Sequence, residues 1–322
     1  MTPGLEYHQL HRAERWSWWR PLVGAVSVLG LLFVVLPVVL MVPFLVLLAL
    51  AGAGAEDVNG FLTFDPVTPL SLAYLLLTLA GGIHLTIAAT AVLHRLTPGW
   101  LVSVVGRIRW SWLVVCLALS MVALGARIVV GLLVPVAPDE AAVEQSLNPV
   151  DLTMLAFAVV ILLATPLQAA GEEFVFRGYL TQAVGGCFRP GWAGRLAAVL
   201  VPAFVFALAH GAQDPPIFVD RFAFGIVAGV LVIATGGLEA AIAMHVLNNF
   251  LAFGLAVLFG DLSSALEPTS GTWWSLPLTL AQSLVYLGLA LLVGRAMGLS
   301  TRTPAARPIG GAPVLAPPNR SL

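Results

Sequence analysis

The sequence predicts an all-α integral membrane protein with eight transmembrane helices. Of its 322 residues, 59% are hydrophobic and 10% are charged, whereas soluble globular chains carry about 25% charged residues. The mean hydropathy is +0.97. Eight apolar segments approach the length of about 20 residues that a helix needs to cross a bilayer. Composition and segment length together exclude an ordinary soluble domain.

The predicted helices cover most of the chain. The first contains Pro37 and Pro43, so we expect it to kink or tilt. Three tryptophans near position 18 precede it and suit the headgroup interface. No small-residue cleavage pattern follows, which favours a span over a signal peptide. The predicted spans are 21–53, 69–93, 110–136, 151–187, 195–211, 221–236, 238–260 and 275–297.

The fourth predicted helix, 151–187, is too long for an untilted span if it is continuous. Two alternatives are open at this point. The helix either breaks near Pro166 or projects into the cytoplasm, and the depth of its polar residues depends on which is correct.

Charges in the loops predict the orientation. If the N-terminus is cytoplasmic, nearly all arginines fall on the cytoplasmic side, as the positive-inside rule requires. Both termini are therefore expected in the cytoplasm. The opposite loops hold one arginine, Arg221, and the acidic residues Glu56, Asp57, Asp65, Asp139, Glu140, Glu144, Asp214, Asp220, Asp261 and Glu267.

Five segments follow from this pattern. We expect a cytoplasmic segment at 1–20, three helices within 21–149, a catalytic core at 150–260, the last helix within 261–297 and a tail at 298–322. The tail is rich in proline and small residues, which predicts disorder. Every basic residue is arginine, and the chain is rich in Ala, Val, Leu and Gly, which indicates a GC-rich bacterial genome and hence a bacterial plasma membrane.

The expected partners are a lipid bilayer and a membrane-associated peptide or protein. The arginines are scattered and the net charge is −1, so no basic patch for nucleic acid is present. The two cysteines, Cys116 and Cys187, are far apart and form neither a disulfide framework nor a Cys-type zinc motif.

A few ionisable residues lie inside predicted spans, where each is costly and indicates a functional site. The fourth helix carries Gly-Glu-Glu-Phe-Val-Phe-Arg-Gly at 171–178, the fifth ends in His210, and the seventh carries His-Val-Leu-Asn-Asn at 245–249. His245 and Asn249 are four residues apart and share one helix face. The midpoint of 172 and 210 falls in the expected loop 187–195, so Glu172 and His210 should lie at equal depth.

These residue types suit peptide hydrolysis. A buried carboxylate, here Glu172, can deprotonate an attacking water, and His210 can bond the same water. His245 and Asn249 can donate to the oxyanion of the tetrahedral intermediate. Arg177 follows Glu173 by four residues, so the two should pair and offset the cost of burying both charges.

A second arrangement uses the same atoms. Glu172, His210 and His245 could instead hold a divalent cation such as zinc, whose bound water attacks. The chain lacks the His-Glu-x-x-His helix of many zinc peptidases. Metal-bound and metal-free hydrolysis both stay open here.

The three motifs resemble one family. Glu-Glu-x-x-x-Arg at 172–177, Phe-x-x-x-His at 206–210 and His-x-x-x-Asn at 245–249 are similar to those of the CAAX-protease and bacteriocin-processing (CPBP, or Abi) intramembrane endopeptidases. The resemblance covers residues 150–260 and implies eight helices with a site in a cavity of the fourth, fifth and seventh. It implies that Glu172 activates water, that His210, His245 and Asn249 complete the site, and that Arg177 is supporting.

Two other functions place similar residues in a membrane. A proton-coupled secondary transporter uses Glu and His as a relay, but the repeated halves typical of transporters are not visible here. A non-catalytic immunity or scaffold protein would retain the motifs without cleavage. Replacing Glu172 with Gln discriminates between a peptidase, which should lose cleavage, and a scaffold, which should keep its phenotype.

Overall fold

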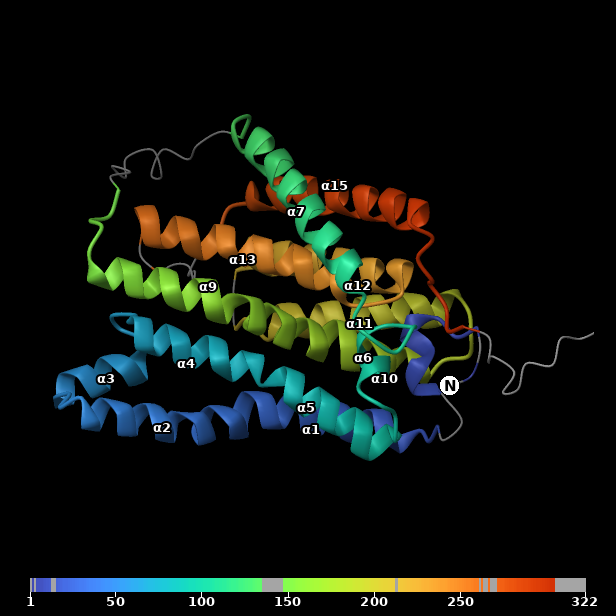
Figure 1. The fold of residues 1–322 in the computed structure, drawn as a ribbon, viewed down its shortest axis with the longest axis horizontal. Coiled ribbons are helices and arrows are strands. Elements are labelled where there is room, and N and C mark those ends of the chain that lie inside the picture. The colour runs from blue at the N-terminus through green and yellow to red at the C-terminus, as the bar shows by residue number, and fades with distance from the viewer. Residues whose placement is uncertain are drawn as a thin grey trace, which may run out of the picture.

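The computed structural model describes residues 2, 4–12, 16–134, 147–211, 214–260, 262, 266 and 271–304. This part of the chain is helical and contains no β-strand. Most long helices run side by side along one direction, and α7 crosses them obliquely (Figure 1). Several expected loop charges and most of the expected tail lie outside the described residues, namely Asp139, Glu140, Glu144, Asp261, Glu267 and 305–322.

Within the described residues, seven helical stretches are long and apolar enough to cross a membrane. The fifth predicted span corresponds to α11, an apolar helix of 17 residues. Their number and composition are those of a multi-pass membrane protein. The seven stretches are α1 (Trp19–Gly30) with η2 (Leu31–Val35) and α2 (Leu36–Leu50); α4 (Pro69–Ala80) with α5 (Gly82–Ala89) and η3 (Thr90–His94); α7 (Trp110–Gly131); α9 (Leu152–Glu173) with η4 (Phe174–Leu180) and α10 (Thr181–Gly186); α12 (Pro215–Thr235); α13 (Glu239–Phe259); and α15 (Ser275–Ala296). The shorter α11 covers Trp192–Leu208. Three shorter helices are η1 (Tyr7–Arg12), α3 (Ala55–Thr63) and α6 (Gly99–Val102).

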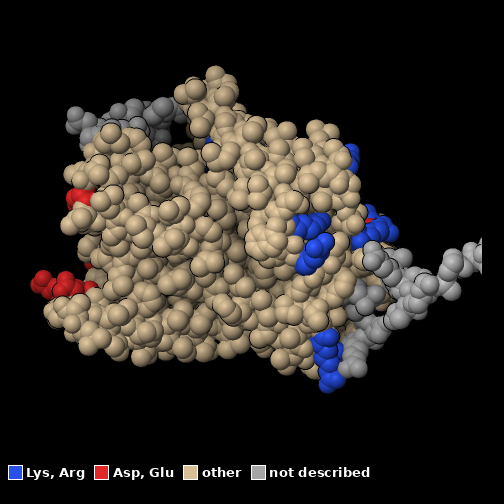
Figure 2. Space-filling view, in the orientation of Figure 1, with Lys and Arg blue, Asp and Glu red and all other residues tan. Residues whose placement is uncertain are grey.

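The surface is apolar between two charged ends. Large side chains such as Val34, Leu132 and Leu152 are 65%, 81% and 84% exposed, which suits a lipid environment. Arginines gather at the end where the N-terminus lies, and acidic side chains at the opposite end (Figure 2). The charges therefore separate along the helix axes, as the loop pattern predicts.

The fourth predicted helix is continuous. It runs for 35 residues from Leu152 to Gly186 and passes through Pro166 without a break. At about 1.5 Å per residue, it spans roughly 52 Å, well beyond a hydrocarbon core of about 30 Å. Its far part, η4, has the wider π-helical turn, a geometry that often occurs at functional sites.

The sixth span begins earlier than hydropathy predicts. Asp214 caps α12 by accepting a hydrogen bond from the Ile217 backbone N–H at 3.4 Å, and Pro215 occupies the first turn. The expectation that Asp220 and Arg221 lie in a loop is therefore wrong, because both lie within the helix. Both side chains are therefore carried by α12, a helix that borders the candidate site described below.

The two ends of the described chain meet at the arginine-rich end. Glu6 accepts hydrogen bonds from Arg195 and Arg302, and the Thr303 backbone N–H donates to the Leu5 carbonyl at 2.9 Å. We call residues 4–12 and 299–304 the terminal clamp. Residues 299–304 belong to the tail expected at 298–322, and these bonds join them to the N-terminal segment.

Candidate active site

Glu173 and Arg177 form a buried ion pair on the long helix. Arg177 Nη1 donates to Glu173 Oε1 at 3.0 Å, and both side chains are at most 1% exposed. The spacing of four residues allows this contact because they share one face of the helix. The structure therefore has the pairing that the sequence predicts.

His245 lies between the two glutamates. Its Nδ1 is 2.7 Å from Glu173 Oε1, and its Nε2 is 3.6 Å from Glu172 Oε2. Glu173 Oε1 already accepts from Arg177, so it acts as an ionised acceptor, and Nδ1 must carry the proton. His245 therefore donates to Glu173 and presents Nε2 to Glu172.

Gln168 connects Glu172 to Asn249. Gln168 Nε2 donates to Glu172 Oε1 at 2.7 Å, and Asn249 Nδ2 donates to Gln168 Oε1 at 2.9 Å. Gln168 was not among the predicted site residues. Its position four residues before Glu172 was the available signal, because that spacing places both on one face.

His210 enters the site through Phe206. The His210 ring lies 4.5 Å from the Phe206 ring, which is 6.0 Å from the His245 ring. The Arg177 guanidinium lies 4.1 Å from the centre of the same Phe206 ring. Glu172 and His245 are within electrostatic range of His210. Phe206 is thus the packing residue around which the predicted side chains gather.

The neighbouring helix α12 completes the wall of the site. Phe224 packs its ring 5.3 Å from His245, and a Cβ at Gly225 would lie 3.3 Å from Arg177 Nη2. The predicted residues therefore come together from α9 and η4, α11 and α13, with α12 as an unexpected fourth contributor.

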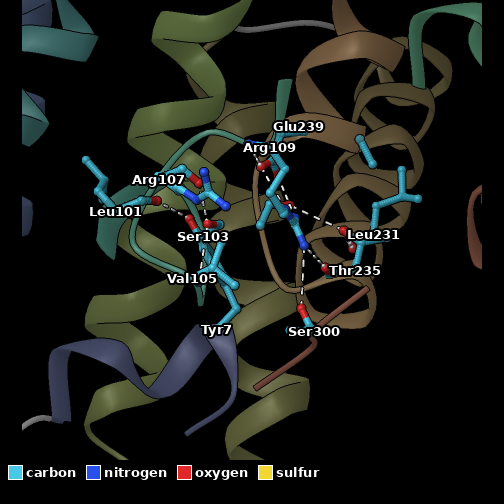
Figure 3. Close-up of polar contacts among 12 residues, drawn as sticks. Tyr7, Leu101, Ser103, Val105, Arg107, Arg109, Leu231, Thr235, Glu239 and Ser300 are labelled. Carbon is cyan, nitrogen blue, oxygen red and sulfur yellow. Dashed lines mark hydrogen bonds and ion pairs between the residues drawn. The ribbon is translucent and has the colours of Figure 1, made fainter. Parts of the chain in front are cut away.

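A second ion pair holds α13 in place. Arg109 Nε and its backbone N–H both donate to Glu239 Oε1 at 2.9 Å, and Arg109 Nη1 donates to the Thr235 carbonyl at 2.8 Å (Figure 3). The pair fixes the turn between α12 and α13 beside the loop that contains Ser103. Glu239 is thus a structural residue that positions the helix carrying His245.

Arg127, which lies in α7, is outside the site. Its Nη1 donates to Thr279 Oγ1 on α15 at 3.3 Å, and Asp220 on α12 is within electrostatic range. The three residues form a polar contact among α7, α12 and α15. This contact offsets the cost of an arginine within a span.

The side chains proposed as metal ligands are Glu172, His210 and His245, and their geometry bears on whether they could hold a metal ion. Within the described residues, no three His, Cys, Asp or Glu side chains are arranged to hold a metal ion. Both His245 ring nitrogens face glutamates, and His210 Nδ1 faces the Phe206 carbonyl at 2.7 Å. Glu172, His210 and His245 do not fit a metal site in this geometry.

All of the predicted site residues lie in a region of the chain that is similar to a known protein family. Residues 153–251 match the family model described as type II CAAX prenyl endopeptidase Rce1-like. The similarity indicated by the three motifs is confirmed. This Rce1-like segment begins near the start of α9 and ends within α13, so it also includes Gln168 and Phe224.

A curated protein is similar to part of this chain. The uncharacterized protein YyaK of Bacillus subtilis (strain 168) is 27% identical over 165 residues, which is 48% of this chain and 53% of YyaK. The match thus spans about half the length of that relative. No solved structure matches the chain.

Proposed function

We propose that the protein is an intramembrane endopeptidase that hydrolyses a peptide bond in a membrane-associated protein or peptide. One observation carries the proposal: Glu172 Oε2 is buried, accepts no hydrogen bond within the described structure and lies beside His245 Nε2 at 3.6 Å. Its other oxygen is fixed by Gln168. An oriented carboxylate with one available oxygen suits a general base. The similarity to a protease family supports the same reading.

Residues of this chain account for every proton transfer in the proposed reaction. Glu172 takes a proton as water attacks the substrate carbonyl, an oxygen–carbon bond forms, and the carbonyl π electrons move to oxygen. The carbon–nitrogen bond then breaks as Glu172 returns the proton to the departing amine. His245, oriented by Glu173, can share the proton of Glu172 through Nε2. Asn249 acts through Gln168 to orient Glu172.

The metal-bound version would require a rearrangement. His210 and His245 would both have to turn toward Glu172 and give up their present contacts. We therefore propose that Glu172 activates water directly. Treatment with a strong chelator tests this: activity should be retained, and a loss that zinc restores would overturn the direct mechanism.

The cellular setting is part of the proposal. We place the protein in a bacterial plasma membrane with both termini in the cytoplasm. The arginine-rich end with the terminal clamp supports this orientation.

The decisive experiment compares wild type with Glu172→Gln, both purified in detergent, on a panel of fluorogenic peptides that includes prenylated and unprenylated forms. Wild type should cleave at least one peptide, and the variant should cleave none. Thr165→Val, one turn before Gln168, is the matched control and should cleave normally. Equal cleavage by Glu172→Gln would exclude the mechanism. A cellular phenotype of the protein that the variant leaves unchanged would favour a non-catalytic scaffold.

A further inference from the structure

Peptide hydrolysis moves a negative charge from Glu172 to the substrate oxygen. The expected oxyanion donors are partly engaged: His245 Nδ1 donates to Glu173, and one of the two Asn249 Nδ2 hydrogens is donated to Gln168. Arg177 is paired with Glu173 and fully buried. A cation near Glu172 would stabilise the oxyanion that inherits its charge.

Arg221 is positioned to supply this cation. It precedes Phe224 by three residues and Gly225 by four, so all three share one face of α12. Phe224 contacts His245, and Gly225 faces Arg177. The Arg221 side chain therefore lies on the face that borders the site. Glu172 and His210 are both within its electrostatic range.

Arg221 differs from Arg177 and Arg127 because its guanidinium is available to bind a substrate group. Arg177 is 1% exposed and bonded to Glu173, and Arg127 donates to Thr279. Arg221 is partly exposed and makes no hydrogen bond or 4 Å ion pair with the rest of the described chain. An arginine inside a span is costly, which indicates a functional role.

The adjacent Asp220 is within electrostatic range of Arg221 but, among the described residues, forms no ion pair with it. Successive residues of a helix point about 100° apart, and Asp220 lies near Thr279 and Arg127 on the side of α7 and α15. Arg221 is thus directed to the site while its neighbour joins the polar contact outside it.

We propose that Arg221 is a catalytic residue that stabilises the oxyanion formed on the substrate carbonyl. The inference rests on the proposed peptidase function. Arg221 attracts the Glu172 carboxylate before the attack and the substrate oxyanion after it. The negative charge therefore moves within the field of one guanidinium, and no new charge has to be buried.

The test measures kcat and KM separately for Arg221→Gln and Arg221→Lys. Removing one oxyanion donor lowers kcat on the order of 10²–10³-fold. We expect that loss in Arg221→Gln with KM unchanged, and partial recovery in Arg221→Lys, which keeps the charge. Arg295→Gln, at the exposed end of α15, is the control and should retain wild-type kcat.

A binding measurement gives a second readout that does not depend on cleavage. A peptide phosphinate is an anionic mimic of the tetrahedral intermediate, whereas the parent peptide amide is neutral at that position. Arg221→Gln should bind the phosphinate much more weakly than wild type and the amide equally well, with thermal unfolding unchanged.

The outcomes distinguish this inference from the proposed function. If wild type cleaves and Arg221→Gln keeps its kcat, the inference is wrong and the peptidase stands. A rise in KM confined to peptides that carry a carboxylate would assign Arg221 to substrate binding and also overturn it. Equal loss in both variants with lowered thermal stability would make Arg221 structural. A wild type that neither cleaves peptides nor binds the phosphinate would refute both proposals.

Discussion

His245 Nδ1 lies 2.7 Å from Glu173 Oε1, the same oxygen that accepts from Arg177 at 3.0 Å. The second glutamate of the pair thus orients the histidine, and in the proposed mechanism the first acts on water. Two adjacent residues of one type are assigned different roles because one is charge-paired and the other is not.

Glu173→Gln should destabilise the protein by about 3–5 kcal/mol, because it leaves Arg177 buried and unpaired. The measurement is thermal unfolding in detergent. The double variant Glu173→Gln with Arg177→Met should recover much of the stability but no activity, since an amide at position 173 can turn its NH2 group toward His245 and no longer supplies a charged acceptor. Recovery of activity would contradict the orienting role of Glu173.

Gln168→Leu should lower kcat while leaving the fold intact. It removes a hydrogen bond to a charged group, worth about 1.5–3 kcal/mol, which corresponds to roughly 10- to 100-fold in rate if expressed in the transition state. Thr165→Val is the control, because the buried Thr165 hydroxyl has no hydrogen-bond partner in the described structure. Unchanged kcat in Gln168→Leu would show that Glu172 needs no such support.

Gly171→Ala should disrupt the site through the backbone. Its Cβ would lie 2.2 Å from the Leu79 carbonyl oxygen, so α4 would have to move away from α9 directly before Glu172. We expect a lower unfolding temperature and loss of cleavage. Gly125→Ala in α7, where a Cβ meets nothing within 4 Å, should be neutral or slightly stabilising. Similar effects of the two changes would contradict this packing.

The terminal clamp should weaken in mild acid. Burial lowers the pKa of His8 from 6.5 to about 4 despite the nearby Glu6 carboxylate, and lowers the pKa of His11 well below its usual value. A released His8 takes up a proton near pH 6.5, but a clamped His8 does not. The clamp is therefore fully stable above that pH and loses up to about 3 kcal/mol from His8 as the pH falls toward 4.

Hydrogen exchange of residues 4–12 between pH 7 and pH 5 checks this prediction, with rates corrected for intrinsic pH dependence. Protection should fall at pH 5. Glu6 does not produce this change, because arginine contacts lower its pKa below 4.5, so its contribution is lost only at lower pH. His8→Gln should reduce the pH dependence, and an unchanged profile in that variant would contradict the assignment.

Much of the fold could be predicted because long apolar runs allow few alternatives. Hydropathy placed the spans close to their observed positions but misassigned Asp220 and Arg221, since it scores charges and ignores the cap at Asp214. Helical spacing gave the Glu173–Arg177 pair. It could not show which glutamate His245 contacts, because that depends on how α13 rotates against α9.

Contacts between segments that are far apart in the chain could not be predicted from the sequence. Glu6 meets Arg195 and Arg302 across 189 and 296 positions, and neither terminal segment is apolar enough to predict that it packs. The role of α12 was missed for the same reason: Phe224 and Gly225 look like ordinary lipid-facing residues until the helix is packed.

The π-helical turns of η4 determine how the face of α10 that contacts the terminal clamp is oriented relative to Glu172. A π-helix holds more residues per turn than an α-helix, so Thr181–Gly186 face a direction that an unbroken α-helix would not give them. Converting 174–180 to α-geometry without changing its length would rotate everything after it by about 100° relative to Glu172. Gly185, which now receives the His8 backbone, would turn away from it. Substitutions that convert this stretch to α-geometry at constant length should thus separate the N-terminal segment from α10 while leaving every site residue in the chain.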